Sequence, residues 1–374
     1  MSAPTHHFPL APSSAARWVA CPASVDLCAR YPGEDTPQSL EGTAAHWVAS
    51  EMLEGVVIPA GTLAPNGVEV TEEMLDAADL YVDDVREVAA GGGDLHIEET
   101  VLIKSIHSDN GGTPDAWHWL AATRVITIWD FKYGHGFVDA YENWQLIDYV
   151  AGILEKLGIN GSNDAQATVR MRVVQPRNYH RDGPIREWSV KAVDLRSYFN
   201  ILRMAATKAW LRKDAKCIPN TECKHCSARH VCTALQQTGF EGMDVVSGMA
   251  PSELSPEALS LELRMLQHYK ARMEARMTGL EAMAAAEIKA GRSVLGFGME
   301  PTQGRVKWTK PIEEVVALGQ MMGVDISKPG ALTPAQAAKK GLPAELLAAY
   351  SARDEGGLKL AAVDGSAARR VFGS

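Results

Sequence analysis

A block of strand-forming segments between residues 96 and 191, with one helical segment inside it, most constrains the fold of this chain. Val, Ile, Thr and Trp are enriched in these segments, as is typical of strands. The order of helix, antiparallel-capable strands, helix and strand favours an α/β core in which helices pack on a mixed sheet. The predicted strands cover 96–103, 115–121, 124–132, 167–174 and 185–190.

Helical segments flank these strands on both sides. Thr71 can cap a helix whose first turn carries Glu72 and Glu73, and the glycines at 91–93 end it. The predicted helices cover 39–53, 71–90, 142–156 and 193–213. After residue 240 the pattern changes, and Pro256 begins a long helix that runs to about residue 290. We therefore expect one domain over 1–240 and a mostly helical extension over 241–374, which ends in a small module.

The charge and hydropathy of the chain exclude some classes of protein. Its 37 basic and 46 acidic residues give a net charge of −9, which does not exclude nucleic acid, because binding depends on a local basic patch. No apolar run approaches the roughly 18–20 residues of a membrane span, and the N-terminus lacks the pattern of a secretory signal. We expect a cytoplasmic protein without a membrane partner, whose six cysteines are thiols or metal ligands.

Two acidic residues lie at the ends of neighbouring predicted strands: Asp115 at the beginning of one strand and Asp130 near the end of the next. Asp115 follows the turn residues Gly112-Thr113-Pro114, and Asp130 and Lys132 lie two positions apart at the end of a hydrophobic strand. Because side chains alternate along a strand, Asp130 and Lys132 share one face. Carboxylates from adjacent strands can hold a hard divalent cation such as Mg²⁺ or Mn²⁺, and an ammonium can offset charge on a phosphate. The alternative for either motif alone is a surface ion pair.

Two further groups lie on predicted helices. His46 follows Gly42, Ala44 and Ala45, which leave room for close backbone packing, although a lone histidine on an apolar helix is more often a core residue. Gln145 and Tyr149 are spaced i, i+4, so they share one face of a helix.

Taken together, and in this order, these motifs resemble the RecB-like branch of the PD-(D/E)XK nuclease superfamily. The matching pairs are Gly42…His46, Gly112…Asp115, Asp130…Lys132 and Gln145…Tyr149. The resemblance covers about residues 10–240. The sequence departs from the family pattern only at Asp130, where many members carry Glu. The order of the whole chain also looks like an uncharacterised bacteriophage and prophage branch of this superfamily.

The resemblance implies a restriction-endonuclease-like core and a role for each matched residue. It implies that His46, Asp115 and Asp130 are metal ligands, with the Phe131 carbonyl as another, and that Lys132 is the catalytic lysine. Gln145 and Tyr149 would hold DNA or shape the site.

The cysteines form a second candidate metal site. Cys223, Cys226 and Cys232 lie within ten residues, a spacing that lets three thiolates converge on one metal centre. The fourth ligand is either Cys217 or the distant Cys21. Similarity to the AddB-type iron–sulfur members, in which one cysteine precedes the core and three follow it, implies a [4Fe–4S] cluster on Cys21, Cys223, Cys226 and Cys232. A structural Zn²⁺ on the same thiolates is the alternative, and Cys28 and Cys217 are then spare.

The sequence therefore predicts a Mg²⁺- or Mn²⁺-dependent DNA nuclease, most simply an exonuclease that acts on DNA ends in phage recombination or replication. We expect contacts to phosphates with little sequence preference, and Arg170, Arg172 and Arg177 are candidates for them. A recombination or single-strand-binding protein and a second copy of the chain are candidate partners. A phage-encoded protein would act in the host cytoplasm. The alternative function is a non-catalytic DNA-binding or scaffold protein that retains the nuclease fold.

Overall fold

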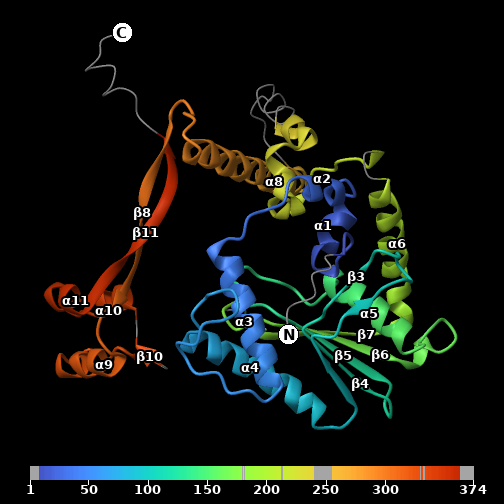
Figure 1. The fold of residues 1–374 in the computed structure, drawn as a ribbon, viewed down its shortest axis with the longest axis horizontal. Helices are drawn as coiled ribbons and strands as arrows, with labels where there is room; N and C mark the ends of the chain where they lie inside the picture. The colour runs from blue at the N-terminus through green and yellow to red at the C-terminus, as the bar shows by residue number, and fades with distance from the viewer. Residues whose placement is uncertain are drawn as a thin grey trace. The chain divides into compact units, whose positions relative to one another are not determined.

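The computed structural model describes residues 8–178, 180, 182–211, 214–239, 255–328, 330–331 and 333–362. The chain forms two compact units, Met1–Arg276 and Met277–Ser374 (Figure 1). The domain boundary predicted at 240/241 falls within residues 240–254, outside the described residues.

A mixed sheet forms the centre of the first unit. Within the described residues it has five strands in the order β1-β4-β5-β6-β7. Strands β5 and β6 are parallel, and each other neighbouring pair is antiparallel, which confirms the predicted mixed α/β sheet flanked by helices. The strands are β1 Asp94–Ile97, β4 Ala116–Leu120, β5 Val125–Phe131, β6 Thr168–Val174 and β7 Ile185–Lys191.

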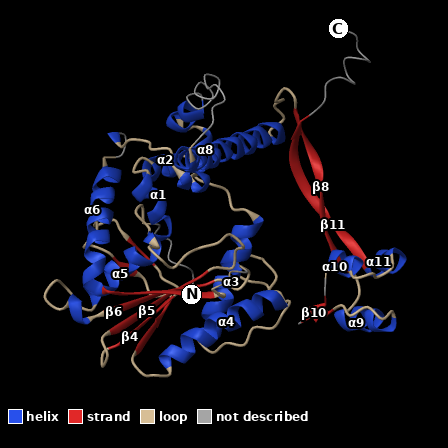
Figure 2. Ribbon diagram, turned by 180° about the vertical axis from the view of Figure 1, so that it is seen from behind, coloured by secondary structure: helices blue, strands red, loops and turns tan. Residues whose placement is uncertain are grey.

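Helices cover both faces of this sheet, and Figure 2 separates them from the strands by colour. Ile126 and Ile128 of β5 belong to the core shared with α1, α5 and α6. Trp129 and Phe131 belong to the core shared with α3 and α4. Alternation along the strand therefore places Asp130 on the α5 side. The helices are α1 Ala15–Ala20, α2 Ser24–Arg30, α3 Pro37–Leu53, α4 Glu72–Ala89, α5 Trp144–Lys156 and α6 Arg196–Trp210.

The prediction of one continuous strand over 96–103 is wrong. The structure divides it into β1 and the two-residue strand β2 (Val101–Leu102), which pairs with β3 (Gly111–Gly112) instead of joining the large sheet. Between them Glu98 has a φ of 46°, a conformation that non-glycine residues seldom adopt and that no strand can continue. The break brings Glu98 beside the start of β4, where its amide donates to the Asp115 carbonyl.

Short helical turns complete the first unit. They are η1 Pro12–Ser14, η2 Asp164–Gln166, η3 Ala192–Leu195, η5 Thr221–His225 and η6 Ser227–His230. The last two carry the cysteine-rich segment. The N-terminal part of the long helix α8 (Pro256–Lys289) packs on this segment, because Ala275 shares a small core with Cys223 and Leu235.

The second unit begins within α8 and contains both helices and strands. The predicted long helix is confirmed, since α8 covers nearly all of it. The remaining helices are α9 Ile312–Met321, α10 Pro334–Lys339 and α11 Ala344–Tyr350. An antiparallel ribbon of β8 (Phe297–Trp308) and β11 (Ser351–Ala362), and a small pair of β9 (Ser327–Lys328) and β10 (Gly330–Ala331), were not predicted. In neither unit does a described helix combine the length and apolarity needed to cross a membrane.

Candidate active site

The helix α3 carries His46 to the end of the sheet. Thr36 and Ser39 form a capping box at its start, in which the Thr36 side chain accepts from the Ser39 amide at 3.1 Å and the Ser39 hydroxyl accepts from the Thr36 amide at 2.8 Å. Pro37 occupies the first turn, where its missing N–H costs nothing. Ala44 and Ala45 are buried, so α3 packs closely here and leaves the His46 ring half-buried.

Asp115 lies immediately before β4, and two contacts fix its carboxylate. Its Oδ1 lies 3.0 Å from Nδ1 of His46. Its Oδ2 accepts a hydrogen bond from the Phe131 amide at 2.7 Å. Asp115 therefore connects the helix α3 with the end of β5, as the predicted site requires.

Asp130, Lys132 and Gln145 form a closed triangle of contacts. Lys132 Nζ lies 2.9 Å from Asp130 Oδ1 and donates to Gln145 Oε1 at 3.2 Å. Gln145 Nε2 donates to the same Asp130 oxygen at 2.9 Å. The Lys132 amide continues the ladder of β5 by donating to the Val174 carbonyl at 2.8 Å. The lysine is therefore held at both its backbone and its side chain.

The first turns of α5 support the site from the other side. Asn143 caps this helix, since its Oδ1 accepts from the amides of Gln145 and Leu146. One turn later Tyr149 is buried and donates its hydroxyl to the Thr113 carbonyl at 3.0 Å. Thr113 belongs to the turn that leads into Asp115. Of the two roles predicted for Tyr149, this position fits the shaping of the site.

The charges in the site shift one another's protonation. Burial opposes protonation of His46, but Asp115 outweighs it and raises the pKa of the imidazole. Burial would raise the pKa of Asp115, yet the charge and hydrogen bond of His46 lower it. Burial, and then repulsion from Asp115, raises the pKa of Asp130 against the opposing effect of Lys132. Burial opposes a charged Lys132, but the two carboxylates raise its pKa, so the ammonium stays protonated.

Glu98 belongs to this site and was missed by the sequence analysis. Ligand atoms of His46, Glu98 and Asp115 all lie within 4.8 Å of one another. Glu98 is exposed at the surface, but partial desolvation of its carboxyl group, and then the charge of Asp115, raises its pKa to about 7, while His46 lowers it. The available signal was the acidic pair Glu98-Glu99 within a segment predicted as a continuous strand.

Two buried polar atoms in this region have no hydrogen-bond partner among the described residues. They are Asp130 Oδ2 and the hydroxyl of Tyr81, which α4 contributes. Tyr81 stacks on Phe131 with ring centroids 5.1 Å apart, and burial followed by the charges of Asp115, Glu98 and Asp130 raises its pKa. An unpartnered buried carboxylate oxygen of this kind is chemically suited to coordinate a cation, so the residues present fit the predicted metal.

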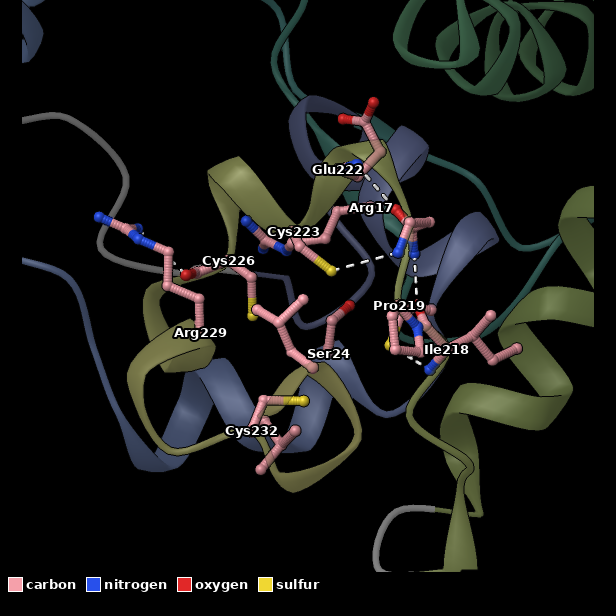
Figure 3. A pocket seen from close by; sticks show the side chains of 13 residues that line it. Arg17, Ser24, Ile218, Pro219, Glu222, Cys223, Cys226, Arg229 and Cys232 are labelled. Carbon is pink, nitrogen blue, oxygen red and sulfur yellow. Dashed lines mark hydrogen bonds between the residues drawn. The ribbon is translucent and has the colours of Figure 1, made fainter. Parts of the chain in front are cut away.

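The four cysteines predicted as cluster ligands line one pocket of the first unit (Figure 3). They are Cys21, Cys223, Cys226 and Cys232. The Ile218 and Asn220 amides donate to the sulfurs of Cys21 and Cys223, each at 3.3 Å. Amide donors of this kind stabilise thiolate ligands and tune the potential of an iron–sulfur centre. The donor set therefore fits a thiolate-bound metal group.

The two cysteines expected to be spare also lie near this pocket. Cys28 is half-buried and its sulfur lies 3.6 Å from that of Cys226, so this cysteine, expected to be spare, lies beside one of the predicted ligands. The hydrogen bond from Cys226 lowers the pKa of Cys28 to about 5, against burial and with help from Arg17. Burial, and then the charges of Cys232 and Cys21, raises the pKa of Cys217 to about 11. All six thiols are unbridged.

The arginines predicted to contact phosphates already have acidic partners. Arg172 pairs with Asp84 at 2.8 Å and with Glu187 at 2.7 Å. Arg177 pairs with Glu41 at 3.2 Å and Glu73 at 3.0 Å. Arg170 lies 3.9 Å from Glu187. A phosphate would therefore compete with carboxylates for all three guanidinium groups.

This fold and its two clusters define an α/β protein that gathers carboxylates, a histidine and a lysine at one end of a mixed sheet, and thiols around a separate pocket. The chain belongs to the family described as "Protein of unknown function (DUF2800)", whose model matches residues 7–349. A solved structure titled "Crystal structure of SSO0001" is similar over 62% of this chain and 89% of that chain, with 14% sequence identity and a TM-score of 0.31. That likeness is too slight to carry an argument.

Proposed function

We propose that this chain is a divalent-metal-dependent DNA nuclease of the RecB-like PD-(D/E)XK type, with a restriction-endonuclease-like core. The observation that carries the proposal is the contact set of Asp130, Lys132 and Gln145, which the hydrogen bond from the Phe131 amide to Asp115 brings next to a second carboxylate. A simple surface ion pair would not require this second carboxylate, the half-buried Gln145 amide and the unpartnered oxygen of Asp130 in one place.

Each residue has a task in phosphodiester hydrolysis. His46, Asp115, Asp130 and the Phe131 carbonyl would hold Mg²⁺ or Mn²⁺, which when bound polarises the scissile phosphate and acidifies a water molecule. Lys132 stays protonated, so it places a positive charge where negative charge builds on the phosphate and orients the attacking water. Gln145 fixes the Lys132 ammonium relative to Asp130.

A cleavage assay tests the proposal. End-labelled linear DNA and closed circular DNA of the same sequence are incubated with the protein in Mg²⁺ or Mn²⁺. An exonuclease degrades only the linear substrate, whereas an endonuclease also cuts the circle. The variants Lys132→Ala and Asp115→Ala should abolish cleavage and retain the circular dichroism of the wild type. Full activity in either folded variant would remove the assignment, and an inactive wild type that still binds DNA would favour the non-catalytic scaffold.

We infer that the thiol pocket holds a [4Fe–4S] cluster on Cys21, Cys223, Cys226 and Cys232. The four cysteines line one pocket, and the Ile218 and Asn220 amides donate to the sulfurs of Cys21 and Cys223. Such amide donors tune the potential of a thiolate-bound iron–sulfur cluster. A structural Zn²⁺ on the same thiolates is the alternative.

The biological setting follows from the same resemblance. We infer an exonuclease of phage or prophage origin that processes DNA ends in the host cytoplasm during recombination or replication. A recombination or single-strand-binding protein is the candidate partner. Contacts to DNA phosphates are electrostatic, so DNA binding should weaken with added salt. Arg172 and Arg177 contribute to these contacts only if phosphate replaces their acidic partners.

A further inference from the structure

One buried side chain holds the exposed loop over residues 134–138, which we call the glycine loop. Gln175 follows β6 and is 0% exposed. Its Nε2 donates to the carbonyls of Gly134 at 2.8 Å and Gly136 at 2.6 Å, and its Oε1 accepts from the Val138 amide at 3.2 Å. The donors and the acceptor of this side-chain amide are therefore all used to shape the loop.

The inward-facing carbonyls direct two amides of the glycine loop outward. A trans peptide points its C=O and its N–H in opposite directions, and no cis peptide bond occurs among the described residues. The Gly134 and Gly136 carbonyls face the buried Gln175, so the amides of the residues that follow them face away from it. These are the amides of His135 and Phe137, and neither has an acceptor among the described residues. The loop therefore offers two hydrogen-bond donors to a ligand.

The protein itself does not require glycine at either position of this loop. A Cβ added at Gly134 or Gly136 would meet no atom within 4 Å, and neither residue has the left-handed φ that favours glycine. Glycine also lets a ligand approach the backbone closely. Gly136 lies between the two outward-facing amides, and the lack of a side chain there keeps the space in front of them open.

A buried cation lies against the same loop. Arg186 of β7 is 6% exposed, and its guanidinium donates to the Val138 carbonyl at 2.7 Å and to Gln175 Oε1 at 2.6 Å. Among the described residues it forms no ion pair, because Asp139 and Asp182 act on it only from beyond salt-bridge distance. A buried charge without a counter-charge carries an uncompensated desolvation cost. An anion bound to the loop would offset that cost.

The glycine loop lies close to the proposed catalytic lysine along the chain. Gly136 is four positions after Lys132, so their Cα atoms are at most about 14 Å apart. Successive nucleotides of one strand rise by about 3.4 Å in a duplex. A strand whose scissile phosphate lies at Lys132 can therefore reach the loop within a few nucleotides.

We propose that the glycine loop binds a phosphate of the substrate strand beside the scissile phosphodiester, through the amides of His135 and Phe137 and the positive charge of Arg186. The proposal rests on the proposed function, and it names a substrate contact outside the motifs that suggested that function. Successive backbone amides form anion-binding concavities in proteins. Contacts of this kind position a strand without reading its bases.

Binding of modified DNA tests the loop without reference to cleavage. Ca²⁺ replaces Mg²⁺ so that DNA binds without being cut, and fluorescence anisotropy measures the affinity of the full-length protein for fluorescein-labelled linear DNA. In a series of such DNAs, one phosphate at a time is replaced by a neutral methylphosphonate. The wild type should lose affinity about 10- to 100-fold at one position near the cleavage site, as expected for lost hydrogen bonds to a charged group.

Gly136→Ala should weaken binding of the unmodified DNA by a similar factor. It should lose little more when the methylphosphonate occupies the sensitive position, because the variant and the modification remove the same contact. Gly161→Ala is the matched control, since Gly161 is also exposed and its added Cβ would likewise meet nothing within 4 Å. The control should bind every DNA as the wild type does.

Each result decides a different question. If Gly136→Ala binds unmodified DNA as tightly as the wild type, or if the methylphosphonate weakens both proteins equally, the loop does not hold a phosphate and the proposed nuclease stands. A wild type that binds no DNA would overturn the proposed function itself. Thermal unfolding checks that Gly136→Ala is folded. Gly134→Ala is made in parallel, and it should weaken DNA binding as well.

Discussion

The imidazole of His46 lies 3.0 Å from the carboxylate of Asp115, although 69 positions separate them in the chain. This contact joins the helix α3 to the start of β4. Asp115 in turn accepts from the Phe131 amide, so a helix and two strands meet at one carboxylate. The candidate site depends on this junction.

Gln145 should be a positioning residue for Lys132. We expect Gln145→Ala to lower the rate of DNA cleavage about 10- to 100-fold, because loss of a hydrogen bond to a charged buried group costs roughly 1–3 kcal/mol. The effect should fall on kcat, since Gln145 contacts Lys132 and Asp130. Single-turnover kinetics at saturating DNA measure it, with the exposed Gln38→Ala as the control. A rise in KM with unchanged kcat would instead place Gln145 on the DNA.

Replacing Asp148 with asparagine should stabilise the protein at alkaline pH. Asp148 is 0% exposed, its two oxygens share the Asn110 side-chain amide, and burial raises its pKa well above the usual value. Its contribution to stability is therefore complete below the unfolded pKa of about 3.9 and is lost as pH rises through the folded pKa. An asparagine at position 148 does not ionise, so its contribution to stability does not fall as pH rises. Its amide can also donate to Asn110 Oδ1, which is buried and has no hydrogen-bond partner among the described residues.

We expect Asp148→Asn to gain about 1–2 kcal/mol over the wild type at pH 8, which corresponds to a pKa shift of roughly one unit or more. The gain should shrink towards pH 4. Urea unfolding of both proteins at a series of pH values measures it. A difference that does not change with pH would show that folding does not raise the pKa of Asp148.

Gly152 should tolerate no side chain. A Cβ there would lie 2.5 Å from Val101 Cγ1 and 2.8 Å from Ile103 Cγ1, where α5 crosses β2. We expect Gly152→Ala to destabilise the protein by about 1–3 kcal/mol through overpacking. Gly42→Ala on α3 is the control, because nothing lies within 4 Å of its added Cβ, and alanine favours the helix by up to about 1 kcal/mol. Thermal unfolding measures both variants; equal melting temperatures would contradict the packing.

The thiol pocket should give the protein a visible colour. We expect an anaerobic preparation to be brown, as thiolate-bound iron–sulfur clusters are. Cys21→Ala should lose the colour and melt at a lower temperature, since Cys21 joins the start of the chain to the segment near Cys223 and metal-coupled folds depend on their centre. Cys28→Ala should keep the colour, although Cys28 lies beside Cys226. A colourless protein with one zinc per chain would establish the zinc alternative.

Several local features could be predicted from the sequence because they depend on short-range geometry. Strand alternation predicted Asp130 and Lys132 on one face, and Lys132 Nζ lies 2.9 Å from Asp130 Oδ1. Thr71 was predicted to cap a helix, and its hydroxyl accepts from the Met74 amide. The spacing of Gln145 and Tyr149 placed both on the inner face of α5. Each of these relationships joins residues that lie within four positions of one another, so the geometry of a single helix or strand determines it.

Only the tertiary structure decided which distant groups meet. Glu98 was read as part of a continuous strand, and its positive φ and its place opposite Asp115 depend on how β1 pairs with β4. The sequence predicts Cys28 to be spare as a ligand and does not indicate its neighbours; the packing of α2 brings it to Cys226 across 198 positions. The ribbon of β8 and β11 likewise depends on strand pairing at long range. A local pattern specifies which face a side chain occupies, whereas its partner is determined by the burial of apolar surface over the whole chain.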